Sequence, residues 1–305
     1  MSTPPNLALP PSARRVTIAT SGGPLAALEC PARPGPRHGC ALLVPGFTGS
    51  KEDFLAVLEP LSRRGFLVLA LDLRGQYESP GPDEESAYRL DRLAADVLEV
   101  ATALAEEYGD PHLLGHSLGG LVVRAAVLAG APAASVTLLD SGPGPIPDAK
   151  HPMLLALRAA LPEADLEDVW TAKEALDRAD GWQPPSPEVL AFLHGRFVAN
   201  SPWGLRAKAG ILLDAPDRTE DLARAVPGDR LLVAYGEWDD AWSPQEQAAM
   251  ARRLSAREVV LAGCAHSPAA EDPDATATVL AEFWTSVSTT SDRRPADDAD
   301  AVGAR

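Results

Sequence analysis

The chain has 305 residues, 46% of them hydrophobic and 23% charged, a balance typical of a globular protein and not of a disordered or membrane-embedded one. Its formal net charge of -16 at pH 7 argues against nucleic acid as a partner, because phosphate binding depends on clustered Lys and Arg side chains. The length allows one large α/β domain with an inserted subdomain, since single cores stop growing at about 250–300 residues.

The first predicted elements form a hairpin. Residues 1–13 are Pro-rich and predict a flexible N-terminus. Strand-like residues at 15–20 and 25–30 then flank Ser21-Gly22-Gly23, a tight turn, which predicts an antiparallel hairpin at the edge of a sheet. From Cys40 the pattern changes, because the buried strand CALLVPGF is followed by apolar residues at helical spacing over 51–64.

Strands and helices then alternate along the chain. In order, they are the strand FLVLALDL, a helix at 88–108, the strand HLLGHS, a helix at 118–129, the strand VTLLD and, after an interruption, the strand RLLVAYG, a helix at 244–254, the strand EVVLAG and a helix at 275–287. Continuous apolar strands between helices predict an α/β fold, a mostly parallel, doubly wound sheet covered on both faces. We assign this core to 14–145 and 228–287.

An insertion at 146–227 interrupts the alternation. It is helix-like, and we expect it to form a helical lid, or cap, over the sheet. Its aromatic residues fill the core of this subdomain or line a substrate pocket. With Trp242 of the core, the candidates for substrate lining are Trp170, Trp182, Phe192, Phe197 and Trp203. The tail at 288–305, rich in Ser, Thr, Asp and Ala, is predicted to be disordered.

The sequence GHSLGG, residues 115–120, lies between a predicted strand and a predicted helix. It contains a G-x-S-x-G motif in the strand-turn-helix context that the motif's chemistry needs. Glycines two residues before and after Ser117 let the chain turn sharply, so that the hydroxyl projects from the carboxyl edge of the sheet. Ser117 is therefore the candidate nucleophile, and a serine that caps a helix is the alternative.

A serine hydroxyl is a weak nucleophile, so it needs a neighbouring base and an acid that orients this base. His266 follows the strand EVVLAG, and Asp239 follows the strand RLLVAYG. Because ligands bind where parallel strands end, we expect Ser117, Asp239 and His266 to meet there as a catalytic triad. Asp140 ends the strand VTLLD and is the alternative acid, and Asp240, directly beside Asp239, is a second rival.

Acyl transfer also needs hydrogen-bond donors for the developing oxyanion. We expect one to be the backbone amide of Leu118, directly after the candidate nucleophile. The other is the amide of Phe47 in VPGFTGS, after the strand CALLV, where Gly46 allows a close approach of the backbone.

Together these motifs resemble the α/β-hydrolase superfamily, in particular its bacterial lidded serine esterases. The resemblance rests on PGFTGS, DLRGQYESPG, GHSLGG, GEWDD and CAHSPAAEDP, spread over about 40–284. The chain departs from the family's usual pattern at Pro45, where a His is common, and at Gln76-Tyr77, where a His-Gly pair is common. The resemblance implies a carboxylesterase-like enzyme, of class EC 3.1.1 and without a cofactor, which hydrolyses a carboxylic ester, thioester or lactone through an acyl-enzyme.

Other functions stay open. An amide or carbon-carbon bond hydrolase of the same fold, or a ligand-binding protein that retains the triad, fits the same residues. Dehalogenase or epoxide-hydrolase chemistry on this fold would need a carboxylate in place of Ser117.

Two further features bear on metals and on the compartment. His112 and His116 lie on a predicted strand, where a spacing of four does not make a metal-binding pair, and Cys30, Cys40 and Cys264 form no CxxC motif. The start MSTPPNLALPPSARR has no apolar core of signal-peptide length, and no segment approaches the roughly 18 apolar residues of a membrane helix. We expect a cytoplasmic protein with a small-molecule substrate and with no metal, nucleic acid or membrane partner.

Overall fold

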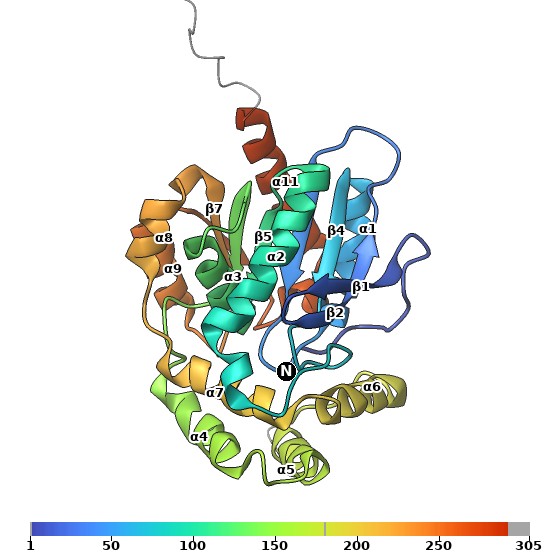
Figure 1. Ribbon diagram of the computed structural model, residues 1–305, viewed down its shortest axis with the longest axis vertical. Helices are drawn as coiled ribbons and strands as arrows, with labels where there is room; N and C mark the ends of the chain where they lie inside the picture. Colours follow the sequence, from blue (N-terminus) through green and yellow to red (C-terminus); the bar gives the residue numbers. More distant parts are fainter. Residues whose placement is uncertain (1, 180, 292–305) are drawn as a thin grey trace, which may run out of the picture.

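A computed structural model describes residues 2–179 and 181–291 (Figure 1). Its centre is an eight-stranded sheet in the order β1-β2-β4-β3-β5-β6-β7-β8. The strands are β1 Arg14–Thr20, β2 Gly23–Cys30, β3 Gly39–Val44, β4 Phe66–Leu71, β5 His112–His116, β6 Ser135–Leu139, β7 Leu231–Gly236 and β8 Arg257–Leu261. β1, β2 and β4 pair antiparallel, and β3 to β8 pair parallel.

The sequence predictions of an edge hairpin and a mostly parallel sheet are confirmed. β1 and β2 are joined at Thr20 and Gly23, which face each other across the turn. All residues of β4, β5, β6 and β7 are buried, as expected for strands covered on both faces.

Helices cover both faces of the sheet. The α-helices are α1 Leu55–Arg63, α2 Leu90–Tyr108, α3 Leu118–Leu128, α4 His151–Ala160, α5 Leu166–Ala179, α6 Pro187–Val198, α7 Pro202–Asp214, α8 Thr219–Ala225, α9 Pro244–Leu254, α10 Pro268–Glu271 and α11 Pro273–Ser291. Shorter 3-10 turns lie at Lys51–Phe54, Glu85–Tyr88, Asp148–Lys150 and Gly228–Arg230. Apolar side chains of α2, α3, α8 and α9 pack on one face, and those of α1 and α11 pack on the other.

Helices α4 to α8 connect β6 to β7 and occupy the predicted insertion at 146–227. Helices α4 to α7 gather at one end of the sheet (Figure 1). Leu154 of α4 and Leu212 of α7 pack there with Leu118, the first residue of α3, so this layer covers the edge where the parallel strands finish. α8 instead packs beside α3 and α9, and its Leu222 joins the core on the sheet.

The N-terminal segment contacts both the sheet domain and the insertion. The guanidinium of Arg196 on α6 donates to the Ser2 carbonyl at 2.7 Å and to Asp53 Oδ1 at 2.5 Å. Leu7 packs on the apolar core of the insertion, and Leu9 packs beside α1 and α11. Residues 2–13, which the composition predicts to be flexible, are therefore held at several points; residue 1 lies outside the described residues.

The last described element is α11, which extends the helix predicted at 275–287 by a few residues at each end. The predicted disordered tail at 288–305 overlaps the last turn of this helix, and 292–305 lie outside the described residues. Among the helices that the structure describes, none combines the length and apolarity needed to cross a membrane.

Candidate active site

Ser117 occupies the sharp turn between β5 and α3. Its backbone lies at φ 55° and ψ -122°, a conformation that few residues other than glycine adopt. Two glycines make room for this turn. A Cβ atom on Gly115 would lie 2.3 Å from the carbonyl oxygen of Gly119, and one on Gly119 would lie 2.3 Å from that of Val44. The strained turn projects Ser117 from the end of the strand, as the G-x-S-x-G motif predicts.

The side chains of Ser117, His266 and Asp239 form a continuous hydrogen-bonded line. Nε2 of His266 lies 3.0 Å from Oγ of Ser117, and Nδ1 lies 2.8 Å from Oδ1 of Asp239. Because a carboxylate can only accept, Nδ1 carries the proton and the lone pair of Nε2 faces the serine hydroxyl. The three side chains come from loops after β5, β7 and β8.

The loop of His266 is fixed by two side chains. The carboxylate of Glu271 accepts the amides on either side of the histidine, from Ala265 at 2.5 Å and from Ser267 at 3.0 Å. Nε2 of His116 donates to the carbonyl of His266 at 2.6 Å. Burial, together with the neighbouring His266 ring, lowers the pKa of His116 to about 3, so this side chain is a neutral donor at neutral pH.

Of the candidate acids, the structure brings Asp239 to the histidine. Asp239 Oδ1 also accepts the Ala241 amide at 2.8 Å, and Oδ2 accepts Nε2 of Gln247 at 2.6 Å. Asp140 is buried beside Asp239 and accepts the backbone amide of Gly236 at 2.9 Å. Asp240 points away and pairs with Lys150 at 2.6 Å.

Asp140, Asp239 and His266 also form a group in which one potential metal-ligating atom of each lies within 4.8 Å of the others. However, Nδ1 of His266 and Oδ1 of Asp239 are bonded to each other, so a cation would have to break that hydrogen bond. Of the two strand histidines, His112 contacts Ser135 Oγ at 2.8 Å and stacks on Trp284. We assign these residues to hydrogen bonding and packing.

The turn after β3 lies against Ser117. A Cβ atom on Gly46 would lie 3.1 Å from Cβ of Ser117 and 3.5 Å from its Oγ. Within the described chain, the backbone amides of Phe47 and Leu118 donate to no backbone acceptor. Leu118 opens α3, whose first amides have no partner inside the helix. Phe47 follows Gly46 in this turn and Leu118 directly follows Ser117, so both amides are candidates to bind an oxyanion that forms at Ser117.

Gln76 holds this turn in place. Its Nε2 donates to the carbonyls of Gly46 at 2.8 Å and Phe47 at 2.9 Å, and its Oε1 accepts the Leu73 amide at 3.1 Å. Gln76 is fully buried. The sequence identifies Gln76 only as a departure from the family's usual pattern. In the structure its side chain is anchored by the Leu73 amide and donates to both carbonyls of the turn.

Beneath the same turn lies a buried ion-pair network. Nζ of Lys51 contacts Asp72 and Glu78, each at 2.7 Å, and Glu52 at 3.1 Å. Lys51 and Asp72 are fully buried. Burial raises the pKa of Asp72 to about 7, although the ammonium of Lys51 opposes this shift.

The predicted substrate-lining aromatics are spread over several sites. Trp170 and Phe197 are buried in the core of the insertion, with Trp182 and Phe192 partly buried against the same cluster. Trp203 is half-buried on α7. Trp242 lies nearest the histidine, with 6.5 Å between ring centroids, and its Nε1 donates to the Pro145 carbonyl at 3.1 Å.

Cys264 precedes His266 by two residues. It is buried, and burial raises its pKa to about 11, so the thiol stays protonated at neutral pH. This state does not suit a nucleophile.

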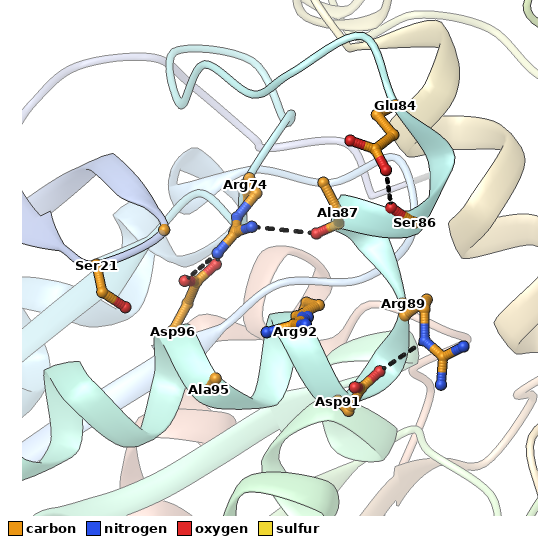
Figure 2. A pocket seen from close by; sticks show the side chains of 11 residues that line it. Ser21, Arg74, Glu84, Ser86, Ala87, Arg89, Asp91, Arg92, Ala95 and Asp96 are labelled. Atoms are coloured by element: carbon orange, nitrogen blue, oxygen red, sulfur yellow. Dashed lines mark hydrogen bonds and ion pairs between the residues drawn. The ribbon is translucent and has the colours of Figure 1, made fainter.

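A cavity of about 560 Å³ lies elsewhere, between the β1–β2 turn and the start of α2 (Figure 2). Ser117, Asp239 and His266 are not part of its lining. Three arginines and three acids line it, and Arg74 pairs with Asp96 while Arg89 pairs with Asp91. The lining thus carries equal numbers of positive and negative side chains.

Comparison with known proteins matches this chain to hydrolases. Residues 41–279 match the sequence pattern of the alpha/beta hydrolase family. N-formylmaleamate deformylase of Pseudomonas putida is 38% identical over 118 residues, which cover 37% of this chain and 42% of that protein. Epoxide hydrolase 4 of Mus musculus is 40% identical over 57 residues, or 19% of this chain and 15% of that protein. The chain thus spans less than half the length of either relative.

Solved structures match over more of the chain. A hydrolase from Pseudomonas aeruginosa PA01 shares 27% identity with a TM-score of 0.70, covering 88% of this chain and 97% of that one. The enol-lactonase from Burkholderia xenovorans LB400 shares 24% identity with a TM-score of 0.72, covering 88% and 100%, a likeness in fold. Hydrolysis is the reaction class that these proteins have in common. With 41–279 matched, the chain belongs to the alpha/beta hydrolase family.

Proposed function

We propose that this protein is a serine hydrolase that cleaves an ester-type bond through an acyl-enzyme, with Ser117, His266 and Asp239 as its catalytic triad. The observation that carries the proposal is the unbroken hydrogen-bonded line from Asp239 through His266 to Ser117. Such a line couples a weak hydroxyl nucleophile to a base that is oriented by a carboxylate.

In the first half of the reaction, Nε2 of His266 takes the proton of Ser117 Oγ as this oxygen attacks the substrate carbonyl carbon. The carbonyl oxygen becomes an oxyanion, which the unpaired amides of Phe47 and Leu118 stabilise. The imidazolium then gives its proton to the leaving group as the bond to the carbonyl carbon breaks, and Ser117 keeps the acyl group.

In the second half, water attacks the acyl-enzyme while His266 takes one of its protons. The tetrahedral intermediate collapses, the carboxylic acid leaves, and the proton returns to Ser117 Oγ. Asp239 stays ionised throughout and stabilises the imidazolium that forms twice. Its additional bonds from Ala241 and Gln247 hold the carboxylate in place between the two half-reactions.

We propose a carboxylic ester, thioester or lactone with an apolar acyl group as substrate. Of these we favour a carboxylic ester or lactone, the class EC 3.1.1. Leu118 shares an apolar cluster with Trp242 and with Leu154 and Leu212 of the insertion, and Phe47 packs against it. The insertion would act as a lid over this site. The neighbours include an enol-lactonase and a putative aryl esterase from Burkholderia cenocepacia.

Amide hydrolysis is the second candidate. It is favoured by the sequence match to a deformylase, whose name describes the removal of a formyl group from nitrogen. The acyl-enzyme chemistry would be the same, with an amine as the leaving group.

The test is Ser117→Ala against Ser86→Ala, a control at an exposed serine. Hydrolysis of p-nitrophenyl acetate and of longer p-nitrophenyl esters is measured, together with labelling by a fluorophosphonate probe. We expect the wild type and Ser86→Ala to be labelled with one probe per chain and to turn over esters, and Ser117→Ala to do neither. Ester hydrolysis that persists in Ser117→Ala contradicts the assignment, and a wild type that hydrolyses neither esters nor amides favours a binding protein.

A further inference from the structure

Asp140 is placed at some cost in free energy. It directly follows β6, and its backbone has a φ of 47°, a left-handed conformation that disfavours most side chains. The side chain is fully buried, and only Oδ1 has a donor, the Gly236 amide at 2.9 Å. Within the described chain, no donor reaches Oδ2. An ionised carboxylate is unstable when it is buried and one of its oxygens accepts no hydrogen bond.

The neighbour of Asp140 is Asp239. The two carboxyl groups are neighbours, with one oxygen of each within 4.8 Å of the other. The other titratable groups that face Asp140 are His266, Cys264 and Glu271 of α10. Burial and the charge of Asp239 both raise the pKa of Asp140 well above its usual range. Two adjacent buried carboxyl groups cannot both be ionised without a large penalty.

The hydrogen bonds decide which of the two is ionised. Asp239 accepts three donors, from Ala241, Gln247 and His266, a set that stabilises a negative charge. Asp140 accepts one donor. The proton that the pair shares therefore belongs on Oδ2 of Asp140, the oxygen that lacks a donor.

We propose that Asp140 is held as a neutral carboxylic acid whose Oδ2–H donates to the carboxylate of Asp239, so that the pair carries one negative charge behind His266. Asp140 is then a positioning residue: it supplies a fourth donor to the triad acid and touches no reacting atom. The inference rests on the proposed function, because the role of Asp239 does.

The first test observes the proton directly. At about pH 8, the infrared spectrum of the wild type minus that of Asp140→Asn should contain the C=O stretching band of a protonated carboxyl group, which ionised carboxylates lack. The difference spectrum also removes other protonated acids, such as Asp72, whose pKa is raised to about 7. The same band should remain in Ser117→Ala. Its absence from the wild-type difference spectrum overturns the proposal.

The second test uses two replacements that both tolerate a positive φ, so backbone strain is matched. In Asp140→Asn, the amide oxygen can accept the Gly236 amide while the amide nitrogen donates to Asp239, as the acid does. In Asp140→Gly, the donor is lost. We expect kcat/KM of Asp140→Asn to stay within about 3-fold of wild type and that of Asp140→Gly to fall about 10-fold or more, as for loss of a hydrogen bond to a charged group.

The pH profile separates positioning from folding. Loss of the fourth donor leaves the Asp239 charge less neutralised, so the acidic limb of kcat/KM should move to higher pH in Asp140→Gly and stay in place in Asp140→Asn. If kcat/KM falls as far in Asp140→Asn as in Asp140→Gly, the proposal is overturned. The infrared band does not depend on turnover. If the triad assignment is wrong, Ser117→Ala stays active and the band is still present. If the inference about Asp140 is wrong, the band is absent and Ser117→Ala is still inactive.

Discussion

The two halves of the candidate active site are held in different ways. The acid–base half comprises the loops after β5 to β8. Burial there lowers the pKa of His116 to about 3, raises that of Cys264 to about 11 and raises that of Asp140 above its usual range. Each shift favours the neutral form, so Asp239 stands as the charge that faces His266.

The β3–β4 half comprises the loops after β3 and β4, and it buries charges in pairs. Lys51 pairs with Asp72 at 2.7 Å, and Arg196 pairs with Asp53 at 2.5 Å. Within this half, Gln76 of the loop after β4 donates to the turn after β3, which lies beside Ser117.

This difference follows from what each half does in the proposed reaction. In the acid–base half a proton moves between the Ser117 hydroxyl and the His266 imidazole. An additional buried charge there would shift this proton-transfer equilibrium. In the β3–β4 half the chain only has to hold two backbone amides still, and buried ion pairs fix geometry without taking part. Substitutions in the first half should therefore act on turnover, and those in the second half on stability and on the placement of the turn.

The largest expected effect is in the acid–base half. His266→Ala removes the base, and kcat should fall by about 10⁴-fold or more while the fold remains, as for other triad residues. Ester hydrolysis and thermal unfolding are the measurements. His194→Ala, a control on α6 where the imidazole pairs with Glu167 at 2.6 Å near the surface, should keep wild-type turnover. Equal activity in the two variants would remove His266 from the mechanism.

In the β3–β4 half, Lys51→Met should act on stability. The replacement leaves Asp72 and Glu52 buried without their cation, which costs about 3–5 kcal/mol in the free energy of unfolding. Lys173→Met on α5, where the ion pair with Asp177 is partly exposed, should cost less than about 1 kcal/mol. Denaturant unfolding of both variants is the measurement, and similar losses would show that the buried network does not stabilise this half.

Gln76→Leu tests how the β3–β4 half holds the turn beside Ser117. Leucine fills a similar volume but leaves the carbonyls of Gly46 and Phe47 without donors, so the turn should shift. A misplaced donor costs about 100-fold in kcat, with little change in KM. Gln76→Glu keeps the acceptor for the Leu73 amide and loses both donors, so it should fall equally far. Gln245→Leu, at an exposed position of α9, should have no effect. If Gln76→Glu keeps full activity, the donors do not matter.

How far the sequence predicts this site depends on how local each contact is. Ser117, Asp239 and His266 could be named because each directly follows a strand of one parallel sheet, and the ends of such strands meet at one edge. The alternation of buried strands and helices predicts that sheet from short-range patterns alone.

The supporting residues could not be named in the same way. Glu271 accepts hydrogen bonds from the loop of His266 only because α10 packs against that loop. Gln76, in the loop after β4, donates to the turn after β3. Both contacts depend on where two loops meet in space, which no spacing along the chain encodes. In the same way, the periodicity of α8 predicts a helix within the insertion but not that its Leu222 packs on the sheet beside α3 and α9.

The last expected effect is a change in pH dependence, and it concerns a lysine that the insertion buries against the β3–β4 half. Nζ of Lys208 on α7 donates to the Arg74 carbonyl at 2.9 Å, and burial lowers the pKa of Lys208 from 10.5 to about 7. Between these values the unfolded chain binds the proton and the folded chain does not, so this group makes the wild type more stable as pH rises from about 7 to about 10. Lys208→Met removes this dependence. Its Tm relative to wild type should therefore be highest at about pH 6 and fall as pH rises through that window, whereas the difference for half-exposed Lys150→Met should stay flat. A flat profile for Lys208→Met would mean that the ammonium is balanced by a charge, as that of Lys51 is, and both buried lysines would then be held as ion pairs.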